Sequence, residues 1–250
     1  MPGLSSKAYK EVYEDWMRGE NIATSVADGV SWLTTADTGG TAGIVVADAE
    51  GPLAEVVLDS TDDDMGELAY HLVTFSGQNG QLSGEARVKI SAGAINSVAF
   101  NVGFNDDALE DSNTLPAELS TTTFTSNSAT FVGVVYDTDA TNDDFHAFWV
   151  DDDTDSSEAI ADLRMTGLAP VADEWFGVRV VLSDRGSGKG MLAEITVCEE
   201  STNKTVQKRF NTNVDRDALL TFGIWMENRA TVAHSFQVDH IHIMQSKATT

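Results

Sequence analysis

The clearest structural signal in the chain is Phe236-Gln237-Val238-Asp239-His240-Ile241-His242-Ile243. Apolar and polar residues alternate along it, which is the period of a β-strand with one buried face. The alternation changes phase in the middle, so Phe236 and Val238 point to one face while Ile241 and Ile243 point to the other. A β-bulge between Val238 and Ile241, or a strand covered on both faces, would accommodate this change.

The same strand-like pattern of apolar and polar residues extends over most of the chain from about residue 30 onward. Arg87-Val88-Lys89-Ile90 is a second clear alternation, and no later segment shows a long helical period. We predict strands at Leu53–Leu58, Leu68–Phe75, Gly84–Ser91, Ser97–Phe104, Thr130–Asp137, Phe145–Val150, Ala159–Met165, Trp175–Ser183, Met191–Cys198, Thr205–Phe210, Leu219–Met226 and His234–Gln245. So many short strands bounded by turn residues predict an all-β fold, a two-sheet antiparallel jelly-roll sandwich.

Two connections between these strands stand out. Asn105–Ser128 is long and rich in Thr, Ser and Asn, which is typical of a functional or mobile loop. Gly186-Ser187-Gly188-Lys189-Gly190 contains a Gly-Lys pair but lacks the spacing and the following helix of a phosphate-binding loop. This glycine-rich segment therefore predicts the tip of a β-hairpin.

Residues 1–27 differ from the rest, and we predict an N-terminal arm there, followed by one sandwich domain over residues 28–250. Ser5 or Ser6 could cap a short helix from Lys7 to about Arg18, with Gly19 ending it. One face of that helix would carry Tyr9, Val12, Tyr13, Trp16 and Met17.

So many aromatic residues on a short helix need a surface to pack against. The helix could fold back on its own domain, or it could dock on a neighbouring subunit. In the second case Tyr9, Tyr13 and Trp16 are the predicted interface anchors, because buried aromatic residues dominate the energetics of interfaces.

Length and composition limit the classes of protein to which the chain can belong. The chain has 250 residues, of which 42% are hydrophobic, so it can bury a core without disulfides. Its one cysteine, Cys198, is expected to be an inert core thiol. The segment Met1–Lys7 lacks the apolar region of a signal peptide, and no apolar run reaches the length of a membrane span. We therefore expect a soluble protein made in the cytosol.

The net charge of −25 excludes several partners. So acidic a chain is repelled by nucleic-acid phosphates and by anionic membranes. The charge is also uneven, because residues 1–175 hold 6 basic and 32 acidic residues, whereas residues 176–250 hold 9 and 8. The acidic part could simply be a solvated surface, or the near-neutral C-terminal third could face a partner.

Five segments carry a resemblance to a known family. They are Gly84–Ile90 (GEARVKI), Asn101–Asp106 (NVGFND), Gly133–Asp137 (GVVYD), Glu174–Val181 (EWFGVRVV) and Val238–Ile243 (VDHIHI). Their order and spacing resemble the strands of concanavalin A-like lectin/glucanase domains, and in particular those of bacteriophage proteins on the outside of the virion. The resemblance covers about residues 30–246 and implies a concanavalin A-like sandwich. It leaves the function open, because the fold hosts lectins, hydrolases and structural proteins.

A glycoside hydrolase needs two carboxylates that face one sugar ring. The glucanase branch of the family supplies them from a Glu-x-Asp-x-(x)-Glu strand, which this sequence lacks. Asp64 and Glu67 fall in a predicted turn, and accidental carboxylate pairs are expected in so acidic a chain. We therefore predict no catalytic residues and no enzymatic activity.

The sequence offers only weak candidates for metal ligands. Asp151, Asp153 and Asp155 alternate as calcium ligands do, but the run lacks the central Gly and closing Glu of an EF-hand loop. Solvated acidic turns are the alternative, and no other cofactor is predicted. His240 and His242 share a strand face and could chelate a transition metal, although no third ligand can be named; ordinary strand histidines are the alternative.

These features lead us to predict a non-enzymatic structural protein of a virion. It would be a capsid decoration or cement protein, made in the host cytoplasm and located on the capsid exterior. Its partners would be the major capsid protein or other virion proteins, with further copies forming a homo-oligomer or symmetric array by multivalent docking. The alternative is a carbohydrate-binding, lectin-like module of a head or tail fibre, whose ligand is a glycan.

Overall fold

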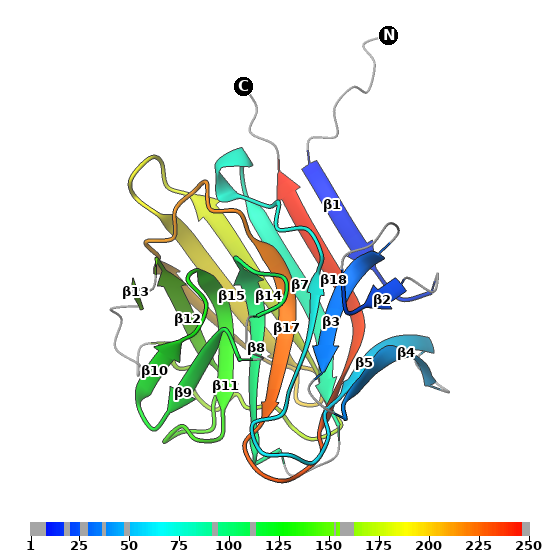
Figure 1. The fold of residues 1–250 in the computed structure, drawn as a ribbon. Coiled ribbons are helices and arrows are strands. Elements are labelled where there is room, and N and C mark those ends of the chain that lie inside the picture. Colours follow the sequence, from blue (N-terminus) through cyan, green and yellow to red (C-terminus); the bar gives the residue numbers. More distant parts are fainter. Residues whose placement is uncertain are drawn as a thin grey trace.

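Two large β-sheets face each other across a buried apolar layer (Figure 1). The computed structural model describes residues 9–17, 21–25, 30–36, 39–47, 51–91, 95–110, 114–152, 154–155 and 163–246. Almost all strand pairs within the described part are antiparallel, the exception being β2 with β3. The predicted sandwich of two antiparallel sheets is therefore confirmed.

Sheet A contains eight strands. In spatial order they are β16 (Lys204–Asn211), β15 (Met191–Glu199), β14 (Trp175–Asp184), β7 (Leu82–Ile90), β18 (Ser235–Ser246), β5 (Gly51–Val57) and β4 (Thr41–Ala47), with β1 (Tyr9–Glu14) also paired to β18. The glycine-rich segment between β14 and β15 is the tip of an antiparallel hairpin, as predicted.

Sheet B also contains eight strands. In order they are β13 (Thr154–Asp155), β12 (His146–Asp151), β11 (Phe131–Asp137), β8 (Val98–Asn105), β17 (Thr221–Asn228), β6 (Met65–Tyr70), β3 (Val30–Ala36) and β2 (Asn21–Ala23). A separate hairpin, β9 (Ala117–Ser120) with β10 (Thr123–Ser126), lies outside this sheet, and a 3₁₀ turn spans Gly77–Asn79.

The last strand, β18, contains the predicted bulge. Its pairing with β7 shifts register between Val238 and His240, so Asp239 is the extra residue. Because one residue is inserted, the two halves of the strand bury the same face. Phe236, Val238, Ile241 and Ile243 are all fully buried.

Aromatic residues join the two sheets across the core. Phe100 of β8 packs edge-on against Phe176 of β14, with ring centroids 5.7 Å apart, and contacts Phe236 of β18 at 6.1 Å. Edge-to-face contacts of this kind add to the stability gained from burying the rings. The core therefore holds strands of both sheets at fixed positions.

The predicted N-terminal helix is wrong. Tyr9–Glu14 forms β1, which pairs antiparallel with β18 from Tyr9 opposite Ser246 to Glu14 opposite Ile241. Pairing with an existing strand satisfies the backbone groups that a short isolated helix would hold only marginally. The edge of β18 thus overrides the helical spacing of the aromatic residues.

The chain after β1 turns inward. Trp16 is 1% exposed, and its ring packs edge-on against Trp32 of β3 at 5.4 Å. Its φ of 60° is unusual for a bulky residue, and a 2.7 Å hydrogen bond from its N–H to a Glu14 carboxylate oxygen stabilises the turn. β1 and β2 each pair with a sandwich strand; the domain boundary at residue 27 stays a prediction.

The sequence predicted strands with strong apolar–polar alternation better than the other strands. Most predicted strands with strong alternation are present within a few residues of their expected bounds. The sequence did not lead us to expect β3, β4 or the β9–β10 hairpin, and most of the segment Ala159–Met165 lies outside the described residues. No helix among the described residues is long and apolar enough to cross a membrane.

The burial of Trp16 leads to a first prediction. Trp16→Ala should lower the free energy of unfolding by roughly 3–5 kcal/mol, because it leaves a cavity beside Trp32. The neighbouring Met17 is 68% exposed, so Met17→Ala should change stability by no more than about 0.5 kcal/mol. Urea denaturation of both variants measures this difference, and equal stabilities would show that the Trp16 ring is not part of the core.

Candidate ligand site

Two aromatic side chains of the protein itself, Phe131 and Trp225, fill the centre of the outer face of sheet B. Gly133, Gly103 and Gly223 lie side by side on β11, β8 and β17. A Cβ at Gly223 would lie 2.6 Å from the Trp225 ring, and a Cβ at Gly133 would lie 2.6 Å from Phe131. The glycines thus leave room for two side chains that fill the face, and no open aromatic platform remains at these described positions.

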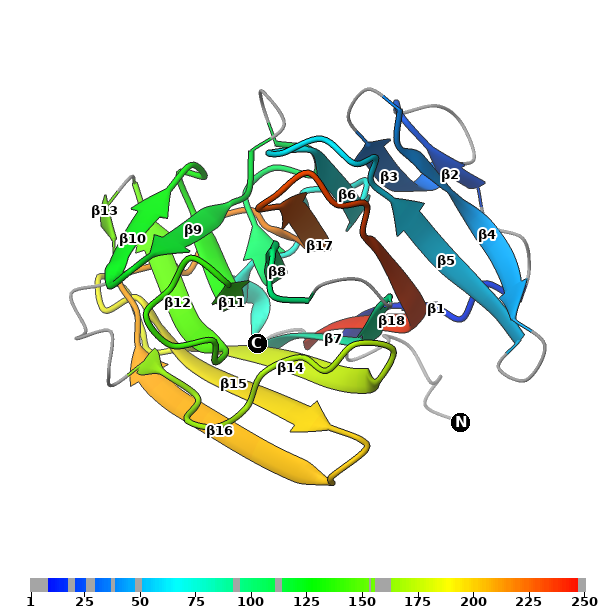
Figure 2. The same cartoon turned by 90° about the horizontal axis from the view of Figure 1, so that it is seen from below.

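The segment predicted as a long loop covers the adjacent part of this face. Its hairpin, β9–β10, lies over β11 and β12 (Figure 2). Leu115, Ala117 and Leu119 are fully buried in a second apolar cluster together with residues of sheet B. The segment is therefore a packed cover with a hairpin of its own.

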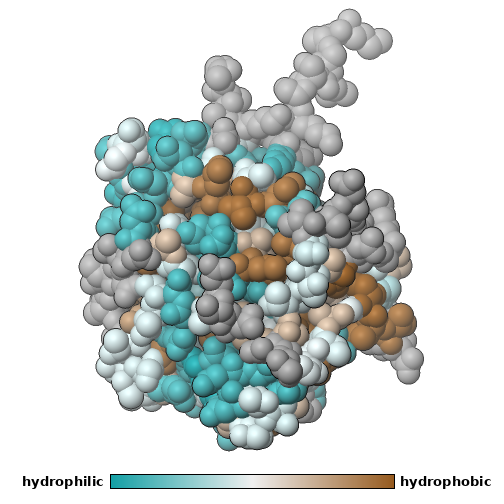
Figure 3. Space-filling model, viewed as in Figure 1, coloured by the Kyte–Doolittle hydropathy of each residue, from teal (hydrophilic) through white to brown (hydrophobic). Residues whose placement is uncertain are grey.

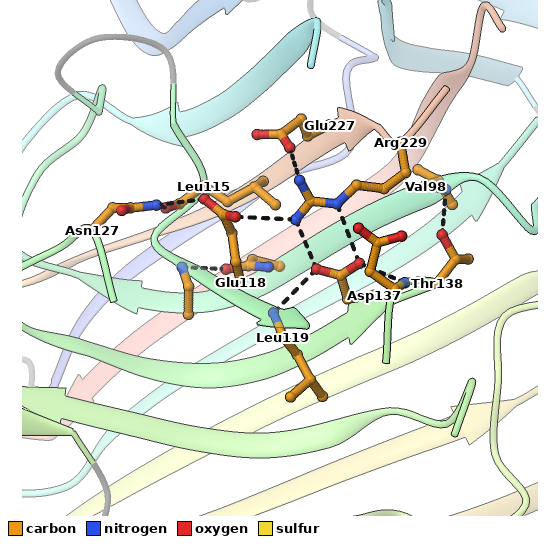
Figure 4. A network of polar contacts seen from close by, with 12 residues as sticks. Val98, Leu115, Glu118, Leu119, Asn127, Asp137, Thr138, Glu227 and Arg229 are labelled. Atoms are coloured by element: carbon orange, nitrogen blue, oxygen red, sulfur yellow. Dashed lines mark hydrogen bonds and ion pairs between the residues drawn. The ribbon is translucent and has the colours of Figure 1, made fainter. Parts of the chain in front are cut away.

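An arginine cluster ties this cover to the sheet (Figure 4). Arg229 donates to both carboxylate oxygens of Asp137, through Nη2 at 2.7 Å and Nε at 3.2 Å. It also pairs with Glu227 of β17 and, at 3.5 Å, with Glu118 of β9. The Leu119 N–H donates to Asp137 at 3.1 Å. One guanidinium therefore connects β9, β11 and the end of β17.

The cluster is buried, and its carboxylates differ in how strongly Arg229 stabilises their charged form. Arg229 side-chain exposure is 9% and that of Asp137 is 1%. Burial lowers the pKa of Arg229, but its bonds to Asp137 outweigh this and keep it charged. Burial raises the pKa of Glu227 to about 7, against the attraction of Arg229. The bidentate Arg229–Asp137 pair is the stable ionic part of the cluster.

A second polar cluster, Glu67 with Glu110, lies on the same face. Glu67 on β6 is fully buried and accepts hydrogen bonds from the Thr35 hydroxyl at 2.5 Å and from the Glu110 N–H at 3.1 Å. The Glu110 carboxylate accepts from Asn105 and, at 2.6 Å, from the Ser128 hydroxyl. These bonds attach Glu110 to β6 and β8 of sheet B and join Ser128, at the other end of the cover, to Glu110.

Desolvation dominates the titration of this carboxylate pair. Burial and, to a smaller extent, the nearby Glu110 charge raise the pKa of Glu67, its hydrogen bonds lower it, and the net result is a pKa of about 7. Burial also raises the pKa of Glu110. The sequence led us to expect Glu67 in a turn. Its place on a buried strand could not be expected without the pairing of β6.

An open pocket lies at one end of sheet B. The strand order β12-β11-β8-β17 brings together the end of β12, the start of β11, the end of β8 and the approach to β17. The pocket has a volume of about 350 Å³ and is lined by Asp106, Thr130, Asp151, Asp152, Asp215, Asp217, Ala218 and Leu219. We call it the aspartate pocket.

The aspartate pocket offers hydrogen-bond acceptors and negative charge. Burial raises the pKa of Asp151, although the Asp215 backbone N–H donates to its carboxylate. Leu219 is 57% exposed and adds an apolar surface. Ionised carboxylates accept hydrogen bonds but cannot donate them, so the pocket suits a ligand rich in hydroxyl or ammonium groups and disfavours anions.

The structure places one of the three calcium candidates in this pocket. Asp151 lines it, Asp153 lies outside the described residues, and of Asp155 only the backbone, in β13, is described. Among the described residues no group of three His, Cys, Asp or Glu side chains could hold a metal ion. The calcium assignment therefore stays untested.

The three predicted interface residues lie in different surroundings. The backbone of Tyr9 belongs to β1, Tyr13 is 58% exposed, and Trp16 lies inside the core. The Tyr13 ring stacks on His240 at 6.1 Å and meets His242 edge-on at 5.8 Å. Of the two rings that the structure describes, only that of Tyr13 is within reach of a partner.

The two strand histidines pair with carboxylates. His242 Nε2 lies 2.9 Å from a Glu11 oxygen, and His240 Nδ1 lies 3.1 Å from an Asp239 oxygen. The bond to Glu85 and the bond and charge of Asp239 raise the pKa of His240, although burial acts against them. The His242–Glu11 contact links β1 to β18.

No protein-family model matches the chain, and no curated protein matches its sequence. Solved structures do resemble it. Peanut lectin superposes with a TM-score of 0.59 at 12% identity, covering 97% of this chain and 99% of the lectin. The carbohydrate recognition domain of Emp47p gives 0.53 at 14% identity over 87% and 89% of the two chains. The marine alginate lyase from Aplysia kurodai gives 0.53 at 6% identity over 84% and 90%.

The fold is a concanavalin A-like sandwich. This confirms the part of the resemblance that concerns the fold, while the bacteriophage part stays a prediction. Lectins and a polysaccharide lyase share the architecture, so the fold does not decide whether the protein is catalytic. The function therefore has to be inferred from the residues of the site.

The buried Glu67 predicts a pH dependence of stability. Its pKa is 4.5 ordinarily and about 7 in the folded protein, so the folded state holds a proton that the unfolded state releases within this window. The resulting stabilisation is fully present below pH 4.5 and is lost as the pH rises through about 7. Glu67→Gln should reduce the stability difference between the two ends of the window by roughly 1–3 kcal/mol.

Chemical denaturation at both ends of the window measures this difference. Glu174→Gln is the control, because Glu174 is exposed and its loss should leave the pH dependence of the wild type in place. If Glu67→Gln and the control behave alike, Glu67 does not take up a proton on folding.

Proposed function

We propose that the protein is a carbohydrate-binding module whose ligand contacts the aspartate pocket. The observation that carries the proposal is the gathering of five aspartates from three strand ends, those of β8, β12 and β17, around one hollow. Paired carboxylate oxygens are suited to accept hydrogen bonds from the adjacent hydroxyl groups of a sugar. The similarity to peanut lectin and to the carbohydrate recognition domain of Emp47p supports this choice at the level of the fold.

The charge of the pocket narrows the class of glycan. Its carboxylates would repel uronic acids and sulfated sugars, and the net charge of −25 adds to that repulsion. Neutral sugars, and amino sugars with an ammonium group, are the ligands that fit. The exposed Leu219 can pack against the C–H face of a sugar ring. This preference differs from that of the alginate lyase, whose name indicates a polyuronate substrate.

We also propose the virion role as a second candidate, for a protein carried on a capsid or a fibre. The supporting observation is the exposure of Tyr13 and Met17, at 58% and 68%, close together in the chain. Exposed apolar side chains of this size suit a contact with another protein. Banding virions on a density gradient and counting copies against the major shell protein tests it; absence from the particles would exclude this role.

Glycan binding should depend on the aspartate pocket. Asp152→Asn/Asp217→Asn should weaken binding of a neutral or amino-sugar glycan at least about tenfold, because two charged acceptors are replaced by amides. Asp62→Asn/Asp63→Asn is the matched control: it removes the same charge from another turn, and Asp63, like Asp152, has a positive φ, which Asn tolerates.

A glycan array followed by calorimetric titration provides the measurement. Titrations in calcium and in chelator also show whether the Asp151 turn holds an ion that the ligand needs. A wild-type protein that binds no neutral or amino-sugar glycan would contradict the proposal, as would equal affinities for the pocket variant and its control.

A further inference from the structure

The cover is attached to sheet B through two kinds of contact. At its hairpin, buried apolar side chains pack on the sheet, and the Leu119 N–H donates to Asp137 at 3.1 Å. The outer surface over β9 and β10 is mostly hydrophilic (Figure 3), and residues 121–123 of the turn are exposed. At the base, where the cover leaves and rejoins the sheet, the attachment consists of hydrogen bonds to Glu67 and Glu110.

The two carboxylates at the base are buried close together. Glu67 is 0% exposed and Glu110 is 8% exposed. The Glu110 N–H donates to Glu67 at 3.1 Å, and the Ser128 hydroxyl donates to Glu110 at 2.6 Å. The start and the end of the cover are thus joined to each other through Glu110, and Glu110 is joined to the sheet through Glu67.

No cation compensates this pair. The strands β3, β6 and β8 carry no Lys, Arg or His, and the charged residue of β17 is Glu227, which is paired with an arginine. Asp106 and Asp107 lie near Glu110, and their charges raise its pKa. No ion pair among the described residues includes Glu67 or Glu110. If both carboxylates ionised, they would repel each other in a buried site.

Two side-chain amides next to the base also favour access of water. Asn101 and Asn105 are fully buried. Within the described part of the chain, Asn101 Nδ2 and Asn105 Oδ1 have no hydrogen-bond partner. A buried polar atom without a partner costs free energy that hydration recovers. Opening of the base would therefore be offset in part by the hydration of these two atoms.

The base of the cover is also a wall of the aspartate pocket. Asp106 and Thr130 line the pocket, and the Asp106 N–H donates to the Thr130 carbonyl oxygen at 3.0 Å. Glu110 follows Asp106 closely in the chain, and Ser128 precedes Thr130 closely. The bond between Glu110 and Ser128 therefore holds together the two segments that form this wall.

We propose that the Glu67–Glu110 pair is a pH-dependent latch. When the pair is protonated, the base of the cover and the pocket wall are closed; when it ionises, both open while the hairpin stays attached. The effect on ligand binding rests on the proposed function of the pocket, whereas the opening of the base does not.

The sign of the pH dependence follows from Glu67. Its pKa is 4.5 ordinarily and about 7 in the folded protein. Opening returns the carboxylate to water, so the closed base holds a proton that the open base releases. This stabilisation of the closed base is fully present below pH 4.5 and is lost as the pH rises through about 7.

Amide hydrogen exchange of the full-length protein without ligand tests the latch. Rates divided by the intrinsic rates at each pH give protection factors. That of the Glu110 N–H should fall at least about tenfold from about pH 5 to about pH 8. At about pH 8 it should be at least about tenfold lower than that of the Leu119 N–H, and it should not respond to low urea concentrations, because a local opening exposes little surface.

Glu67→Gln retains a side chain that can form hydrogen bonds but cannot ionise, so the Glu110 N–H should stay protected at about pH 8. Glu174→Gln, at an exposed position, should behave as the wild type does. Thermal melting shows that each variant is folded. A pH-independent protection factor in the wild type, equal protection of the Glu110 and Leu119 N–H groups, or an equal fall in Glu67→Gln overturns the proposal.

Glycan titrations at about pH 8 test the effect on the pocket. Glu67→Gln should bind a neutral glycan at least about threefold more tightly than Glu174→Gln, because its pocket wall stays closed. Both variants lose one carboxylate and are compared at the same pH, so the titration of Asp151 affects them equally. Equal affinities overturn the regulation of the pocket. If no glycan binds, the proposed function is wrong, and the exchange measurement still decides whether the latch exists.

Discussion

The bulge at Asp239 is the constraint on which the arrangement of sheet A depends. Without the extra residue, the two halves of β18 would bury opposite faces, and Ile241 and Ile243 would face water. With it, β18 buries Phe236, Val238, Ile241 and Ile243 and still pairs with β7 over nearly its whole length. Its other side is divided between β5 and β1, and this division positions both the N-terminal strand and the edge strand beyond β5.

Carboxylates in the interior of the sandwich and carboxylates at the strand ends of sheet B are in different electrostatic environments. Inside, a carboxylate is retained either beside a cation, as Asp137 is beside Arg229, or with a raised pKa, as for Glu67. Both arrangements reduce the cost of an uncompensated buried charge. The aspartates of the pocket lie at strand ends, where solvent reaches them. The excess negative charge of the chain is thus available to a ligand mainly at the rim of the sheet.

Regular alternation of apolar and polar residues allowed much of the sandwich to be predicted, and the phase change within β18 indicated its bulge. β1 was missed because Tyr9, Val12, Tyr13 and Trp16 fit a helix as well as a strand, and only the free edge of β18 distinguishes the two. The pocket was missed because its aspartates come from segments that are far apart in the chain. Their proximity follows from strand order, which local patterns do not contain.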